Sequence, residues 1–223
     1  MLRIGLTGGL GSGKSTVAAM LREKGAEVIE ADELGRQLME PGHAVYDEIV
    51  AEFGPEVVKA DGTLDRARLA DLAFRGGRLE DLNAIVHPAV IAAQGDWMRE
   101  ILGRNHQAIA VVETALIFEV ERDARQRGES EGILTYWRRR FDRVIVVTAP
   151  DEVKIARYVA RLSPAGWDEK VAADARSRLA RQLSDSVKAS RADFILENSG
   201  DVASLKEQVD AVWRQLMELS NKS

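Results

Sequence analysis

The chain contains no cysteine among its 223 residues, which excludes disulfide bonds and thiolate zinc sites. It has no apolar run long enough to span a membrane, and its first apolar stretch, interrupted at Gly8, is shorter than the hydrophobic region of a signal peptide. Positive charge is not in excess either. The formal net charge of −5 argues against nucleic-acid binding through broad neutralisation of phosphates. We therefore expect a cytoplasmic protein with neither a membrane nor a nucleic-acid partner.

The composition that remains is that of an ordinary globular protein. Hydrophobic residues make up 45% of the chain and charged residues 30%. A chain of this length buries a substantial core as one α/β domain with additional small regions.

A phosphate-binding loop is the most specific motif. Residues 8–15, Gly-Gly-Leu-Gly-Ser-Gly-Lys-Ser, match the pattern G-x-x-x-x-G-K-[ST] and follow directly on the apolar strand predicted for residues 2–7. Glycines let backbone N–H groups surround phosphate oxygens, Lys14 adds a positive charge, and Ser15 offers a hydroxyl to Mg²⁺. The dinucleotide fingerprint G-x-G-x-x-G fails, because Lys14 stands where its third glycine is required. The loop predicts a nucleoside triphosphate ligand.

Further strands and helices alternate along the chain, which favours a parallel sheet with a ligand crevice at the carboxyl ends of its strands. We predict an α/β phosphate-loop kinase fold with a five-stranded parallel sheet flanked by helices. The predicted strands are residues 2–7, 27–31, 108–112, 144–148 and 194–196, and the core comprises residues 1–32, 104–160 and 190–223. Residues 33–103 show only helical patterns, broken at several turn dipeptides and at His87-Pro88, and residues 161–185 suggest a helical lid.

Other motifs narrow the class of phosphate-loop protein. A GTPase would carry an Asn-Lys-x-Asp guanine motif, which is absent, and a motor or helicase would often show an Asp-Glu pair where only Glu113 is found. A small-molecule kinase needs a carboxylate near the acceptor hydroxyl, basic residues for the phosphates, and a cover that excludes water. The chain has candidates for all three.

The candidate carboxylates follow predicted strands. Asp32 is the candidate base, although an aspartate in this position is also a good helix cap. Glu113 is the candidate to orient Mg²⁺ through water, together with Ser15. His87 is a candidate substrate contact, with a helix cap or a satisfied local hydrogen bond as its alternative.

The candidate cations lie beyond the fourth predicted strand. Arg157 and Arg161 stand four residues apart on one helical face, so that both can point toward a crevice. The run Arg138-Arg139-Arg140 is more typical of a solvated surface.

The combination of motifs resembles the dephospho-CoA kinase family. The resemblance covers nearly the whole chain and is carried by residues 6–16, 28–32, His87-Pro88 and 116–119, with further matches at 41–42, 60–64, Arg157, Arg161, Arg178, Gln182 and 193–200. It implies ATP and Mg²⁺ as co-substrate and cofactor, and dephospho-coenzyme A as the acceptor at its ribose 3′-hydroxyl, the last step of coenzyme A biosynthesis.

The resemblance also assigns roles. It implies that Asp32 is the base near the 3′-hydroxyl, that Arg157 supports the transferred phosphoryl group, and that residues 33–103 bind coenzyme A. His87 and Arg161 fall on the substrate side. The residues assigned to ATP are Gly11, Ser12, Gly13, Lys14, Ser15, Thr16 and Asn198.

Three positions depart from the family pattern. Glu30 replaces an aspartate in the D-A-D element that ends at Asp32, and Ala115 replaces a frequent proline. Relative to the family pattern, residues 121–140 contain an insertion of about ten residues, a length that a surface loop tolerates.

Two alternatives remain open from sequence. Another small-molecule kinase, such as a nucleoside or nucleotide kinase, would use the same parts for a different acceptor. An ATP-dependent regulatory module would hydrolyse ATP slowly and act by changing shape.

Overall fold

The computed structural model describes residues 1–221. The chain divides into two compact units, one formed by Met1–Ile29 with Met98–Ser223 and the other by Glu30–Trp97. The larger unit carries the sheet and the smaller one is helical, so each is described separately.

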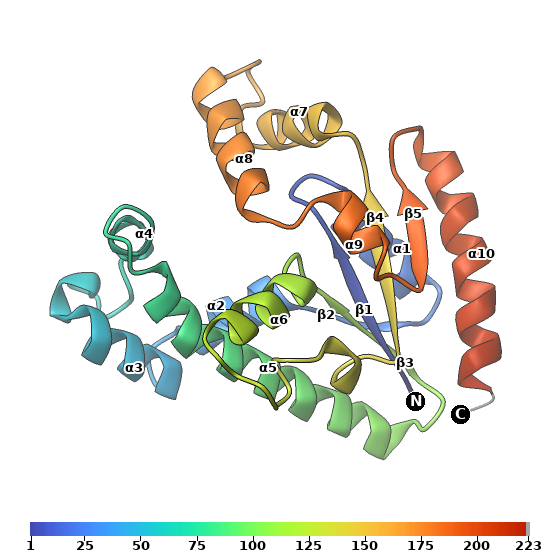
Figure 1. Cartoon of the computed structure of the whole chain (residues 1–223), viewed down its shortest axis with the longest axis horizontal. Coiled ribbons are helices and arrows are strands. Elements are labelled where there is room, and N and C mark those ends of the chain that lie inside the picture. Colours follow the sequence, from blue (N-terminus) through green and yellow to red (C-terminus); the bar gives the residue numbers. More distant parts are fainter. Residues whose placement is uncertain (222–223) are drawn as a thin grey trace. The chain divides into compact units, whose positions relative to one another are not determined.

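A five-stranded sheet forms the centre of the larger unit, with the strand order β2-β3-β1-β4-β5 (Figure 1). The central strand β1 pairs in parallel with both β3 and β4, and β4 pairs in parallel with β5. The strands are β1 (Leu2–Gly8), β2 (Glu27–Glu30), β3 (Ile109–Glu113), β4 (Arg143–Thr148) and β5 (Phe194–Glu197). This arrangement confirms the predicted sheet and places the phosphate loop at the carboxyl end of its central strand.

The two faces of β1 pack differently. Its alternate residues Leu2, Ile4 and Leu6 join an apolar cluster with helices α1 (Lys14–Glu23) and α10 (Val202–Ser220). On the opposite face Gly5 leaves room for Ile117, at the start of α6 (Ile117–Gln126), and for Phe141, since a Cβ at Gly5 would overlap both. The sheet is therefore covered on both sides, as a parallel sheet requires.

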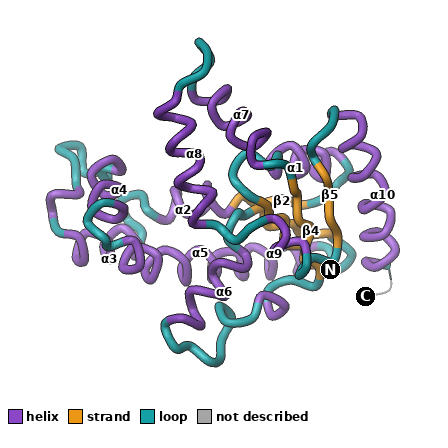
Figure 2. Tube along the Cα trace, turned by 45° about the horizontal axis from the view of Figure 1, so that its top comes forward, coloured by secondary structure: helices purple, strands orange, loops and turns teal. Residues whose placement is uncertain are grey.

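A helical hairpin follows β4. Helix α7 (Asp151–Leu162) packs against α8 (Glu169–Arg181), which leads into the short helix α9 (Asp185–Ala189) (Figure 2). The Tyr158 hydroxyl donates to Asp174 Oδ2 at 2.7 Å, and this bond ties the two long helices together. Residues 161–185, predicted as a helical lid, contain the end of α7, all of α8 and the first residue of α9.

The smaller unit is built from helices α2 (Ala31–Leu38), α3 (Ala44–Phe53), α4 (Arg66–Phe74) and the first part of α5 (Leu79–Arg104), with one 3₁₀ turn η1 (Pro55–Val57). An apolar cluster holds them together, with Ile49, Phe53 and Leu69 among its buried members. Asp65 caps α4 by accepting from two backbone N–H groups at its N-terminus.

The predicted break at His87-Pro88 is wrong. Helix α5 continues through Pro88, although proline removes one helical hydrogen bond. Ile85, Val86 and Ala89 pack against the apolar cluster of this unit, so burial on either side of Pro88 stabilises the helix.

The predicted solvated run at 138–140 is wrong for one residue. Arg138 and Arg139 are exposed in the 3₁₀ turn η2 (Trp137–Arg139), but Arg140 is buried. Its Nη2 donates to the carbonyl oxygen of Ile117 at 3.1 Å. Burial lowers the pKa of Arg140 to about 10, opposed by the attraction of Glu121.

Among residues 1–221, no helix combines the length and the apolar character needed to cross a bilayer.

Candidate active site

Two glycines determine the shape of the phosphate loop. Gly11 has φ +73° and Gly13 has φ +97°, conformations that other residues rarely adopt. A Cβ at Gly11 would collide with the carbonyl group of Lys154, and a Cβ at Gly13 would collide with the side-chain amide of Asn198. These positions therefore need glycine both for backbone conformation and for close packing.

The phosphate loop leads directly into the N-terminus of α1. Lys14, Ser15 and Thr16 form the first turn of that helix, which contains no acidic residue. The positive end of the helix dipole therefore meets no protein carboxylate within its own first turn and suits an anion. Lys14 Nζ donates to the carbonyl oxygen of Gly9 at 3.2 Å, which keeps the ammonium folded back over the loop.

Ser15 and Glu113 meet at the loop. The Ser15 hydroxyl donates to Glu113 Oε1 at 3.1 Å, so the structure brings together the two residues predicted to act at Mg²⁺. Glu113 is buried at the end of β3. A hydroxyl and a single carboxylate are hard oxygen donors that fit Mg²⁺, which completes its shell with substrate phosphates and water. No cluster of three or more His, Cys, Asp or Glu with metal-binding geometry occurs within residues 1–221.

Arg157 and Asn198 form a second contact with the loop. Asn198 is buried, its Nδ2 donates to the Ser12 carbonyl oxygen at 2.8 Å, and its Oδ1 accepts from Arg157 Nη2 at 3.3 Å. Arg157 Nη1 lies 4.0 Å from the position of a Cβ on Gly13 and, within the described residues, is buried without a hydrogen-bond partner. A buried, unsatisfied guanidinium nitrogen beside the loop suits an anionic oxygen.

Comparison with known proteins shows the family of the chain. The family model described as "Dephospho-CoA kinase" matches residues 2–204. A dephospho-CoA kinase from Symbiobacterium thermophilum is 42% identical over 95% of this chain and 80% of its own, and one from Corynebacterium jeikeium is 40% identical over 96% and 98%. The crystal structure of TT1252 from Thermus thermophilus has a TM-score of 0.71 at 32% identity, covering 96% of this chain and 97% of the other.

The chain belongs to the dephospho-CoA kinase family.

The remaining arginines that the family resemblance singled out lie apart from the Asn198 contact. Arg161 is exposed, with its guanidinium carbon 5.4 Å from the centre of the Tyr158 ring. Arg178 ion-pairs with Asp174 at 2.8 Å. Burial raises the pKa of Asp174, but hydrogen bonds from Tyr158 and Arg178 outweigh it and hold that pKa below its ordinary value. Arg161 and Arg178 thus border the α7–α8 hairpin, whereas Arg157 lies at the loop.

Asp32 and His87 belong to the helical unit. Asp32 is exposed in the first turn of α2, whose N-cap is Glu30, so the alternative reading of Asp32 as the cap residue is wrong. His87 is half-buried within α5, so it does not cap a helix. The roles of both residues in this member of the dephospho-CoA kinase family stay predictions.

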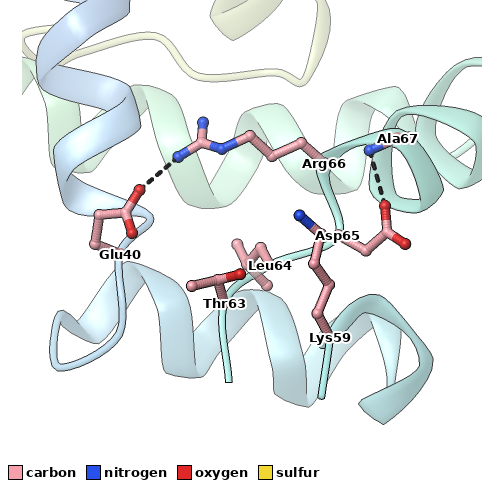
Figure 3. Close-up of a pocket in the computed structure, with 7 residues that line it drawn as sticks. All are labelled: Glu40, Lys59, Thr63, Leu64, Asp65, Arg66 and Ala67. Atoms are coloured by element: carbon pink, nitrogen blue, oxygen red, sulfur yellow. Dashed lines mark hydrogen bonds and ion pairs between the residues drawn. The ribbon is translucent and has the colours of Figure 1, made fainter. Parts of the chain in front are cut away.

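The helical unit also contains a pocket of about 420 Å³ (Figure 3). Arg66 and Glu40 face one another there in an ion pair of 2.9 Å, while Asp65 turns to the N-terminus of α4. The pocket is lined by Glu40, Lys59, Thr63, Leu64, Asp65, Arg66 and Ala67, and so by neither Asp32 nor His87.

Sequence reasoning missed three residues that contact the loop. Gln182 matched the family pattern without an assigned role, and no feature of the sequence was a reason to select Lys154 or Asp185. No signal in the local sequence marked Lys154, because its helical neighbourhood is ordinary and its partner Asp185 lies on another helix.

Proposed function

We propose that the chain is a dephospho-CoA kinase, transferring the γ-phosphoryl group of ATP to the ribose 3′-hydroxyl of dephospho-coenzyme A and releasing coenzyme A and ADP. The match of the dephospho-CoA kinase model to residues 2–204 carries this proposal. The reaction is the final step of coenzyme A biosynthesis, and the absence of cysteine suits a cytoplasmic enzyme.

The geometry of the loop supports ATP as the donor. Backbone N–H groups at the start of α1 are suited to bind phosphates, and Lys14 supplies a positive charge at the same end. Arg157 offers its unsatisfied Nη1 to a phosphoryl oxygen while Asn198 holds the other side of the guanidinium. Catalysis by these groups is chiefly positioning and stabilisation of the charge on the transferred group.

Ser15 and Glu113 are the residues proposed to hold Mg²⁺, Ser15 directly and Glu113 through water. When bound, the ion neutralises phosphate charge and orients the β- and γ-phosphates.

Asp32 is proposed to orient or deprotonate the acceptor hydroxyl. Its exposure in the first turn of α2 leaves the carboxylate accessible to a substrate. His87 and Arg161 are proposed to contact the acceptor. Asn198 is assigned to the nucleotide site, and its buried contacts favour an effect through Ser12 and Arg157 over direct contact with ATP.

The decisive experiment measures ADP release from Mg²⁺-ATP with and without dephospho-coenzyme A, followed by mass analysis of the acceptor. We expect acceptor-dependent ADP and a product heavier by one phosphoryl group. Treatment with a 3′-specific nucleotidase should return the product to the starting mass. A product that resists this treatment would contradict the 3′-hydroxyl assignment.

The alternatives give different results. Phosphorylation of a nucleoside or nucleotide in place of dephospho-coenzyme A would identify another small-molecule kinase. ADP release that is slow and independent of every acceptor would favour a regulatory ATPase.

A further inference from the structure

The segment 182–188 returns from α8 to the sheet and runs past the phosphate loop. It contains Gln182, Ser184, which caps α9, and Asp185, the first residue of α9. Helix α9 lies beside β4 in both views (Figures 1 and 2), in agreement with its contacts to that strand. We call residues 182–188 the return segment.

The return segment binds the loop through a side-chain amide. Gln182 Oε1 accepts the backbone N–H of Leu10 at 3.0 Å. Leu10 lies in the first half of the loop, between the glycines at 9 and 11. The amide therefore fixes a part of the loop that the Asn198 contact at Ser12 does not reach.

An ion pair between a buried lysine and a partly buried aspartate lies beside the same half of the loop. Lys154 Nζ is 2.7 Å from Asp185 Oδ2, and only 3% of the Lys154 side chain is exposed. The ammonium lies 3.2 Å from the position of a Cβ on Gly9, and Asp185 Oδ1 lies 3.4 Å from it. Asp185 Oδ2 also accepts the backbone N–H of Ala149, directly after β4. This pair connects α7, α9 and the end of β4 at the back of the loop.

A second ion pair, buried on both sides, anchors the other end of the return segment. Lys188 Nζ is 2.8 Å from Glu119 Oε1 and donates to the Ala115 carbonyl oxygen at 2.8 Å. The same Glu119 oxygen accepts the backbone N–H of Leu183 at 2.9 Å. The return segment is thus fixed to α6 on one side and presents Gln182 and Asp185 to the loop on the other.

Buried ion pairs contribute little net stability, because the cost of removing charges from water offsets their attraction. The return segment contributes one partner to each of two such pairs, which indicates that the pairs fix the geometry of the chain more than they add stability. They hold in place Gln182, whose Oε1 accepts the N–H of Leu10, and the side chains of Lys154 and Asp185 beside Gly9.

We infer that Gln182 and the Lys154–Asp185 pair are positioning residues that hold the Gly9–Leu10 half of the phosphate loop in its nucleotide-binding conformation. This inference rests on the proposed function only in taking ATP as the ligand of the loop. It assigns these residues no contact with the acceptor.

The first test replaces Gln182 with alanine in the full chain, a change that leaves no buried charge. Titration calorimetry with Mg²⁺-ATP and no acceptor should show a dissociation constant raised about three- to tenfold, the effect of one hydrogen bond. In turnover assays the KM for dephospho-coenzyme A should change less than twofold. Unchanged ATP affinity in a folded Q182A variant would overturn the role of Gln182.

The matched control is Asn105→Ala. Asn105 Oδ1 also accepts a backbone N–H at 3.0 Å, that of Gln107, just before β3 and at the opposite end of this strand from Glu113. The control loses the same type of bond, so it should leave ATP affinity unchanged. An equal loss of ATP affinity in both variants would show a general effect of stability and contradict the inference.

The second test uses the sign of a charge change. Lys154→Met and Asp185→Asn both break the pair, so positioning predicts weaker ATP binding in each. If Lys154 acted only through its charge, Asp185→Asn would remove a nearby negative charge and tighten ATP binding. Tighter or unchanged binding in folded D185N would therefore overturn positioning by the pair.

These measurements separate the inference from the proposed function. ATP affinity without acceptor decides the inference whichever hydroxyl the enzyme phosphorylates, whereas product analysis decides the acceptor. Weakened ATP binding in Q182A together with no phosphorylation of dephospho-coenzyme A would support the first and reject the second.

Discussion

The two units of the chain use polar side chains in opposite ways. Around the phosphate loop, polar groups are buried or partly buried and join residues far apart in sequence, as in the Asn198–Ser12 and Gln182–Leu10 hydrogen bonds. In the helical unit the ion pairs are exposed, as with Arg66 and Glu40, and an apolar cluster holds the helices together.

This difference indicates that the nucleotide side is organised before any ligand binds. Its hydrogen-bond donors are held in place by other protein groups, so the binding of ATP requires little further ordering of side chains. The helical unit presents Asp32 on its surface, without a comparable buried polar network among the contacts described. We therefore expect changes at the loop to affect binding and chemistry together, and changes in the helical unit to separate them.

The largest effect is expected for Lys14→Met. Removal of the ammonium leaves the triphosphate without a charge that acts both in the bound state and during transfer, so kcat/KM for ATP should fall by about 10³-fold. Steady-state kinetics with varied ATP measures this. Lys206→Met, on the exposed face of α10, is the control and should keep normal kinetics. A K14M variant with wild-type kinetics would reject the site.

The next effect is expected for Asp32→Asn. Loss of a general base lowers turnover by about 10²- to 10⁴-fold, and ATP affinity should stay unchanged because Asp32 belongs to the acceptor side. Turnover and ATP calorimetry on the same protein give both numbers. Glu33→Gln, which alters the adjacent exposed carboxylate and its pair with Arg36, should retain activity. Near-normal turnover in D32N would remove the base assignment.

A pair of glycine substitutions tests the comparison through stability. Gly13→Ala combines a left-handed φ with a collision against Asn198, so we expect a loss of about 2–4 kcal/mol in the free energy of unfolding. Gly62→Ala in the helical unit has φ +83° but no atom near the added methyl group, so its cost should be about 1–2 kcal/mol. Urea unfolding measures both. Equal costs would show that packing around Gly13 is looser than the contact with Asn198 indicates.

The smallest effect is expected for Glu40→Gln. Its ion pair with Arg66 leaves both side chains about half exposed, and such pairs contribute less than about 1 kcal/mol. The urea midpoint should move little, and 0.5 M salt should reduce even that small difference. A loss comparable to that of Gly13→Ala would mean that polar contacts organise the helical unit as well.

Local patterns predicted the parallel sheet and the phosphate loop, because both depend on residues at strand ends in a known topology. The same patterns selected Ser15 and Glu113 as Mg²⁺ candidates, and the hydrogen bond between them is added by the structure. The buried Arg140 and the helix through Pro88 were predicted wrongly, because tertiary packing overrides the local preferences of arginine and proline. Lys154 has an ordinary helical neighbourhood in sequence, and its partner Asp185 lies on another helix. Contacts of this kind depend on how distant segments fold together, and a single sequence does not encode them as a spacing.

The hydrogen bond between Asn198 and Ser12 joins residues 186 positions apart. Asn198 directly follows β5, which is a strand at the edge of the sheet. Synthesis proceeds from the N-terminus, so the ribosome makes the phosphate loop long before the strand that secures it. A nascent chain therefore carries Lys14 and its glycines without the support of Asn198 and, through Asn198, of Arg157. The finished nucleotide site is delayed until β5 and Asn198 have been made, and chains that stop short of Asn198 should hold ATP poorly.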